Sequence, residues 1–177
     1  MRNIFLFLFF VITAVNASAQ KNDHIVSVDG IGQLRLGMSK VELEKLLKIK
    51  IVLKHIGVDE RYVETISTKY LGKDIALHLF RSEDKIAILE GLEVTDPVFK
   101  TADGVGIGTD QSTIIDKYEQ DLLIITPEYN DDNTLKKSTR ITFAHIDSYR
   151  AAIIFTLLNK KVVAIEVGPT AEFRDRE

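Results

Sequence analysis

One short segment of this chain occurs twice, and this repetition constrains the fold more than any other feature of the sequence. The segment at residues 33–47 has a counterpart at residues 104–118. A glycine permits a turn after a short apolar strand, a serine or aspartate then caps a helix, and later apolar residues form its buried stripe. The repetition therefore predicts two helices with equivalent starts. The matched pairs are Gly37 with Gly108, Ser39 with Asp110, Leu43 with Ile114 and Leu47 with Tyr118.

A second match closes each half of the chain. Residues 85–90 resemble residues 161–166, which places Glu90 on Glu166, and each segment follows a polar turn. Runs of β-forming residues precede both turns, so each half is expected to end in a hairpin. These preceding runs cover residues 75–81 and 151–158.

The two halves together predict an α+β protein with two tandem repeats of one helix and four strands. The repeats would form an antiparallel sheet with the helices on one face. The first repeat would cover residues 20–97 and the second residues 98–170, because Pro97 cannot donate to a β-ladder and so marks a junction. Residues 171–177 form a mixed-charge tail that is expected to fray. The remaining strands are expected at residues 49–55, 65–70, 122–126 and 139–145.

The helix-opening segment carries a resemblance to known proteins. Residues 32–47, GQLRLGMSKVELEKLL, resemble the helix-opening motif of the BamE/SmpA-like outer-membrane assembly lipoproteins. The arrangement of two tandem halves, each a helix followed by strands, resembles the fold of the β-lactamase-inhibitory-protein-like family. These resemblances imply a tandem helix-and-strands fold and a class of function, which is protein binding in the cell envelope.

The N-terminal segment, residues 1–19, has the three parts of a secretory signal peptide. A basic start at Arg2 precedes an apolar run at residues 4–15, and small residues before and at Ala19 form a cleavage site. The apolar run is too short to span a membrane, and a bacterial lipid anchor would need a cysteine, which the sequence lacks. We therefore expect a soluble periplasmic or secreted protein with neither a membrane span nor a lipid anchor after processing.

The charge balance argues against nucleic acid as a partner. The sequence has 23 basic and 26 acidic side chains, for a formal net charge of −3. Such a weakly acidic and interspersed balance lacks the basic patch that binds nucleic acid. Because there is no cysteine, the stability of an exported chain must come from its core alone.

No pattern of catalytic, cofactor-binding or metal-binding residues meets the spacing that its chemistry requires, so we expect a protein that is not an enzyme. The glycines at 104–108 lack the spacing of a dinucleotide fingerprint. Residues 82–85 have the spacing of penicillin-binding enzymes but lie in an expected turn, without the companion motifs. The four histidines are singly placed, and the Asn/Asp run at 130–133 lacks the alternation of a calcium loop. No cofactor or metal is therefore predicted.

The remaining candidate site is a surface on the open face of the sheet. Alternation along a strand places residues 75, 77 and 79 against the helices and residues 76, 78 and 80 on the opposite, open face. Tyrosines near these strands are of the type enriched in interface anchors. The predicted partner-binding residues are Tyr70, His78, Phe80 and Tyr149.

Two functions remain open at this point. The first is an exported, non-catalytic module, an inhibitor or assembly factor, that binds another envelope or secreted protein through this open face. The alternative is an exported binder of a small ligand or peptidoglycan fragment, which would be held in a cleft between the two repeats.

Overall fold

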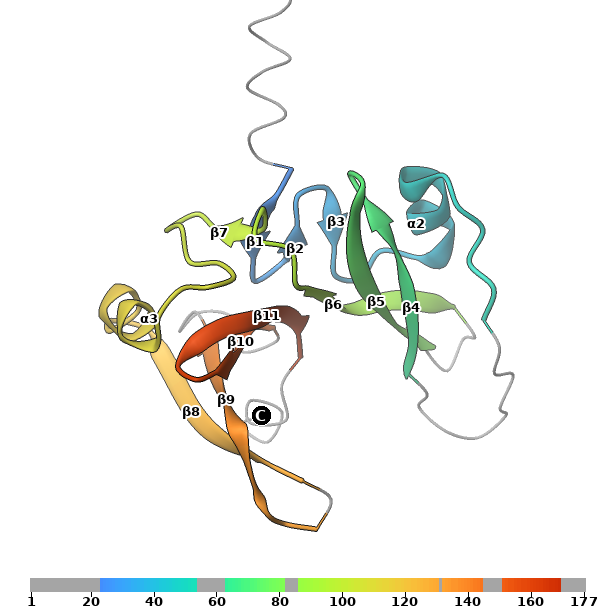
Figure 1. Cartoon of the computed structure of the whole chain (residues 1–177). Helices are drawn as coiled ribbons and strands as arrows, with labels where there is room; N and C mark the ends of the chain where they lie inside the picture. The colour runs from blue at the N-terminus through green and yellow to red at the C-terminus, as the bar shows by residue number, and fades with distance from the viewer. Residues whose placement is uncertain (1–22, 54–62, 82–85, 131, 145–150, 170–177) are drawn as a thin grey trace, which may run out of the picture.

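The computed structural model describes residues 23–53, 63–81, 86–130, 132–144 and 151–169 (Figure 1). The expected signal peptide, the expected C-terminal tail and Tyr149 lie outside these residues. Within them, no helix has the length and apolar character needed to cross a bilayer.

The described chain consists mainly of β-strands. The N-terminal strands are β1 (Ile25–Ser27), β2 (Gly30–Ile31) and β3 (Leu34–Arg35), followed by helix α2 (Lys40–Leu47). The next strands are β4 (Val63–Tyr70), β5 (Lys73–Arg81), β6 (Ala87–Val94) and β7 (Lys100–Thr101), followed by helix α3 (Gln111–Lys117). The last four strands are β8 (Leu122–Tyr129), β9 (Leu135–Ala144), β10 (Ala152–Leu158) and β11 (Lys161–Gly168).

These strands form two sheets. The smaller sheet has the order β3-β2-β1-β7, and β1 pairs with β7 in parallel although β7 lies far along the chain. The larger sheet has the order β4-β5-β6-β11-β10-β9-β8, and all its neighbouring strands are antiparallel. The two halves of the chain therefore join along β6 and β11, with β4 and β8 at the edges.

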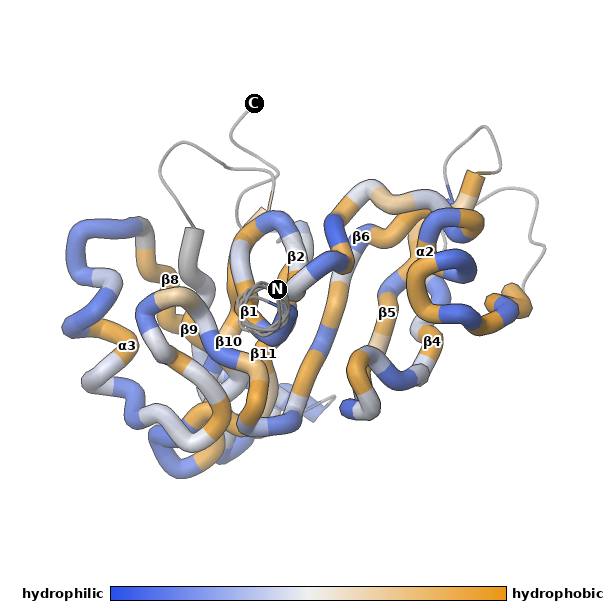
Figure 2. The backbone as a smooth tube through the Cα atoms, turned by 90° about the horizontal axis from the view of Figure 1, so that it is seen from above, coloured by the Kyte–Doolittle hydropathy of each residue, from blue (hydrophilic) through white to orange (hydrophobic). Residues whose placement is uncertain are grey.

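The predicted fold class was wrong. The described chain is mostly β, with two helices of eight and seven residues. These helices lie at opposite ends of the molecule, and Figures 1 and 2 show this from two directions. Each helix fully buries a single residue, Leu43 or Ile114. Helices of two turns are too short to cover a seven-stranded sheet, and Val26, Ile31 and Phe99 of the N-terminal and junction segments complete the core instead.

The alternation predicted for β5 is confirmed. Residues 75, 77 and 79 of this strand are at most 4% exposed, whereas residues 76, 78 and 80 are partly exposed. We use the term open face for the side of β4–β6 that carries the second set. The hairpins predicted around residues 81 and 158 are also present, as β5–β6 and β10–β11.

The strand expected at residues 49–55 does not form in its described part, residues 49–53. Lys48 ends α2 in the left-handed conformation, with φ of 55°. The backbone N–H of Ile51 then donates to Oε1 of Glu44 over 2.8 Å. That N–H group is consequently not available to a β-ladder.

The two predicted helix starts are confirmed. Ser39 and Asp110 are the N-cap residues of α2 and α3. The turn before each cap is also hydrogen-bonded to a strand of the large sheet. The N–H of Gly37 donates to the carbonyl of Leu89 on β6, and the N–H of Gly108 donates to the carbonyl of Val162 on β11. The matched segments thus share a local structure although the predicted fold class does not hold.

These hydrogen bonds change the match between the hairpin strands. Leu89 in the first half is equivalent to Val162 in the second, because each accepts the bond from the matched glycine. Counting on four residues from each makes Glu93 equivalent to Glu166. The predicted superposition of Glu90 on Glu166 was therefore wrong. The physical reason is the length of the first hairpin. Leu79 and Leu157 both follow the register shift, but Leu79 pairs with Leu89, ten residues later, whereas Leu157 pairs with Val162, five residues later. The likeness of residues 85–90 to residues 161–166 gives no sign of this difference in length.

Candidate functional site

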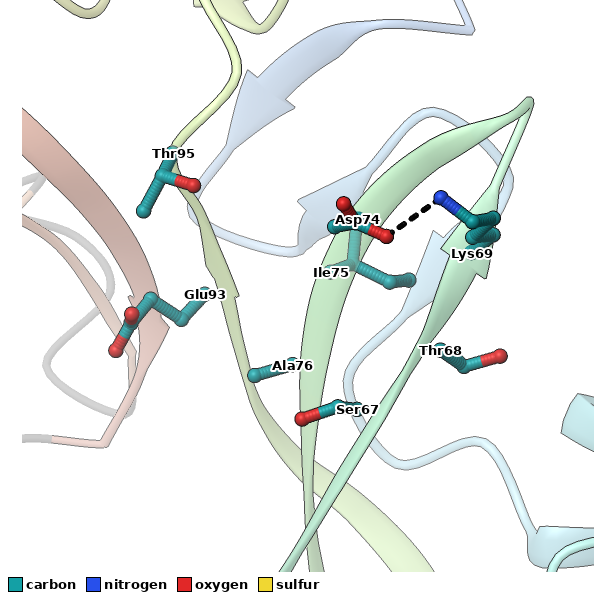
Figure 3. A pocket seen from close by; sticks show the side chains of 8 residues that line it. All are labelled: Ser67, Thr68, Lys69, Asp74, Ile75, Ala76, Glu93 and Thr95. Carbon is teal, nitrogen blue, oxygen red and sulfur yellow. Dashed lines mark hydrogen bonds and ion pairs between the residues drawn. The ribbon is translucent and has the colours of Figure 1, made fainter.

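An open groove lies over the first half of the large sheet (Figure 3). It has a volume of about 410 Å³. Its floor follows one row of cross-strand neighbours, in which Ser67 of β4 pairs with Ala76 of β5 and Ala76 pairs with Glu93 of β6. The groove therefore belongs to the open face. Its lining residues are Ser67, Thr68, Lys69, Asp74, Ile75, Ala76, Glu93 and Thr95.

The cations near the groove are already engaged. Nζ of Lys69 lies 2.7 Å from Oδ1 of Asp74, and Nζ of Lys73 lies 2.9 Å from Oδ2 of Asp96. The pKa of Asp96 is lowered, first because its carboxylate accepts the backbone N–H of Val98 and then because of Lys73. Both lysines are thus held by carboxylates other than that of Glu93.

Glu93 is the acidic side chain of this groove that pairs with no cation in the described part of the chain. Its side chain is partly exposed, and among the described residues it forms neither an ion pair nor a side-chain hydrogen bond. Its carboxylate lies on the β11 side of the groove, away from the Lys69–Asp74 pair (Figure 3). It can therefore accept hydrogen bonds from a cationic group that enters the groove.

A second carboxylate lies directly across the join between the halves. Glu166 of β11 is the cross-strand partner of Glu93, and like charges placed opposite one another destabilise a sheet. Glu166 is neutralised within the chain, because Nη2 of Arg140 lies 3.2 Å from its Oε2. Among the described residues, Glu166 thus has a cationic partner and the facing Glu93 has none.

An apolar pair lies further along the open face. Phe80 of β5 and Ile88 of β6 are cross-strand neighbours, and both are partly exposed. His78 lies two residues before Phe80, and its Nδ1 is 3.0 Å from Oγ1 of Thr65 on β4. The structure therefore brings the predicted residues His78 and Phe80 together on the predicted face.

Tyr70 does not belong to this surface. It is 4% exposed, and its Oη accepts the backbone N–H of Gln33 over 3.0 Å. Burial raises the pKa of the Tyr70 hydroxyl. The expectation of an open-face tyrosine was wrong here, because Tyr70 shares the core side of β4 with Ile66.

The sequence reasoning missed the residues that form the groove. The polar alternation of Thr65, Ser67 and Lys69 along β4 was a signal for the open face, but nothing local singles out Glu93. Its position opposite Glu166 depends on the pairing of β6 with β11, two strands that are distant from each other in the sequence.

No family model, no curated protein and no solved structure matches this chain. Among the described residues, no group of three or more His, Asp or Glu side chains is placed to hold a metal ion.

Proposed function

We propose that this protein is an exported, non-catalytic protein-binding module, and that the open face of β4–β6 is its working surface. It would act as an inhibitor or assembly factor on another envelope or secreted protein. The proposal combines the export signal expected at residues 1–19 with the chemistry of this face.

The observation that carries the proposal is the partial exposure of Phe80 and Ile88. These two side chains are neighbours on the side of the sheet opposite the buried Leu77 and Leu79. Polar groups lie beside them on the same face: His78 is two residues before Phe80, and its imidazole contacts the hydroxyl of Thr65. An apolar centre with a polar rim is the usual anatomy of a protein interface.

The resemblance of residues 32–47 to the BamE/SmpA-like lipoproteins favours the same class of partner. That family works through protein contacts in the cell envelope, and an exported chain would meet such partners. Such a likeness of a short segment transfers a class of function only, so the partner is proposed as a class, an envelope or secreted protein.

Site-specific photocrosslinking tests the proposal. A photoreactive phenylalanine analogue would replace Phe80 in the purified protein, and the variant would be mixed with envelope extract and irradiated. We expect one crosslinked protein at this position and none with the analogue at Val41, a 72% exposed residue on α2. Equal crosslinking at both positions, or none at Phe80, would contradict the proposal.

The groove beside the apolar pair favours the alternative, a small ligand or peptidoglycan fragment. Its volume of about 410 Å³ is in the range of small-molecule sites. It lies over β4–β6, however, whereas the alternative assumed a cleft between the halves. A thermal-shift titration with soluble peptidoglycan fragments would raise the melting temperature if this function holds and would leave it unchanged if it does not.

A further inference from the structure

Strands β4–β6 and strands β9–β11 of the large sheet have the same pairing pattern, so their residues can be compared position by position. The β5–β6 pairing shifts by one residue between His78 and Leu79, and the β10–β11 pairing shifts in the same way between Thr156 and Leu157. Superposing the two shifts aligns β4–β6 with β9–β11. On the open face the aligned pairs are Thr65 with Arg140, Ser67 with Thr142, Ala76 with Ile154 and Glu93 with Glu166.

In the second half this place is filled. Thr142 and Ile154 are each 2% exposed. Arg140 extends from β9 to Glu166 on β11 and forms an ion pair with it at 3.2 Å. Packing and charge are thus both satisfied within the chain.

In the first half the same place is hollow. Alanine at position 76 and serine at position 67 are smaller than the isoleucine and threonine that they align with, and both line the groove. Thr65 stands where the second half has Arg140, and its hydroxyl is engaged with His78. The first half therefore has a carboxylate, Glu93, in the place of Glu166. It has no cation in the place of Arg140 and no large side chain in the place of Ile154.

We propose that the groove receives an arginine or lysine side chain from the partner protein, and that its cation binds Glu93 as Arg140 binds Glu166. This inference rests on the proposed function, since it names the partner's chemistry at the same face. In the structure the nearby lysines Lys69 and Lys73 pair with Asp74 and Asp96, and not with Glu93. The aliphatic part of the entering side chain would cover Ala76, in the space that Ile154 fills in the second half.

A pair of peptides tests the inference on the purified protein. One is a fluorescent dodecamer of alternating threonine and arginine, and the other has neutral citrulline in place of every arginine. We expect the arginine peptide to bind at least about tenfold more tightly, with an affinity that falls as salt concentration rises. Equal binding of the two peptides, or no binding of the arginine peptide, would overturn the inference.

Three variants locate the binding at the groove. Glu93→Gln should weaken binding of the arginine peptide about tenfold, because it removes the charge and keeps the shape. Glu119→Gln is the matched control, since it makes the same change at an exposed residue after α3, and it should leave the affinity unchanged. Ala76→Ile should abolish binding by filling the groove without changing any charge.

Thr65→Arg supplies the missing cation within the chain. The introduced guanidinium group should form an ion pair with Glu93 and so abolish peptide binding. The melting temperature should be no lower than that of the original protein. If Thr65→Arg and Ala76→Ile both bind the arginine peptide as the original protein does, the inference is wrong.

The photocrosslinking experiment separates this inference from the proposed function. A partner crosslinked at Phe80 and retained by both Thr65→Arg and Glu93→Gln would refute the basic side chain and leave the protein-binding function intact. Peptide binding that depends on Glu93, without any crosslinked partner at Phe80, would refute the proposed use of the apolar pair instead.

Discussion

The backbone N–H of Gly37 donates to the carbonyl oxygen of Leu89 over 2.7 Å and ties the turn before α2 to strand β6. Gly108 makes the corresponding bond to Val162 over 2.8 Å, beside α3 and β11. Both glycines have positive φ, at 83° and 87°. Because side chains are strained in that region of backbone conformation, these two turns require glycine.

Replacing Gly37 or Gly108 by alanine should therefore lower the stability of the protein through backbone strain alone. A Cβ atom at Gly37 or Gly108 would meet nothing within 4 Å, so each substitution should lower the free energy of unfolding by about 1–2 kcal/mol. Gly32→Ala should cost clearly more, because its Cβ would collide with the carbonyl of Asp23 and the hydroxyl of Tyr70. Urea denaturation of the three variants measures this order, and a Gly32 variant as stable as the Gly37 variant would contradict it.

The two helix caps should differ in strength. The Ser39 side chain accepts the N–H of Glu42, and the Glu42 carboxylate accepts the N–H of Ser39 over 2.7 Å, so Ser39→Ala should cost about 1 kcal/mol. Asp110 makes no cap hydrogen bond and instead pairs with the exposed Lys161, so Asp110→Ala should cost about 0.5 kcal/mol or less. Equal losses in thermal denaturation would contradict this difference.

Features of this fold that depend on near neighbours could be predicted from the sequence. A glycine, a capping residue and a spaced apolar stripe act within one or two turns of chain, and they located the starts of α2 and α3. Alternation within β5 likewise assigned its two faces, because successive side chains of a strand point to opposite sides.

Features that depend on distant pairing could not be predicted. Strands β1 and β7 have three and two residues, which is too few for a periodic pattern, and their parallel pairing joins segments that are far apart in the sequence. The first hairpin is longer than the second, because Leu79 pairs with Leu89 and Leu157 with Val162, so the likeness of the two hairpin sequences suggested the wrong match for Glu166. The position of Glu93 opposite Glu166 follows from these long-range facts, and local patterns gave no reason to select it.

The position of Tyr70 leads to a prediction that separates core from surface. Tyr70→Phe should cost about 1–2 kcal/mol of stability, because the N–H of Gln33 loses its acceptor. Tyr70→Ala should cost about 3–5 kcal/mol by also opening a cavity in the core. Phe80→Ala is the matched surface variant, with an expected cost of about 0.5–1 kcal/mol. Melting of the Tyr70→Ala and Phe80→Ala variants at the same temperature would refute this assignment.

Tyr118 should make stability depend on pH in the alkaline range. It is 3% exposed, and its Oη donates to Oγ1 of Thr101 over 2.8 Å. Burial raises the pKa of the Tyr118 hydroxyl to about 12, whereas a tyrosine in the unfolded chain titrates near pH 10. The unfolded chain therefore releases this proton at a lower pH than the folded protein does.

The sign of the pH effect follows from that difference. The stabilisation from neutral Tyr118 is fully present below about pH 10 and is lost as pH rises through about 12. Tyr118→Phe should be about 1 kcal/mol less stable at pH 8, because Thr101 loses its hydroxyl partner, but its stability should fall less steeply between pH 10 and 12. Urea midpoints at pH 8, 10 and 11 measure both effects. Tyr129→Phe, at a 55% exposed tyrosine, is the control and should keep the original slope, and a Tyr118→Phe variant with that same slope would show that the Tyr118 proton is not linked to folding.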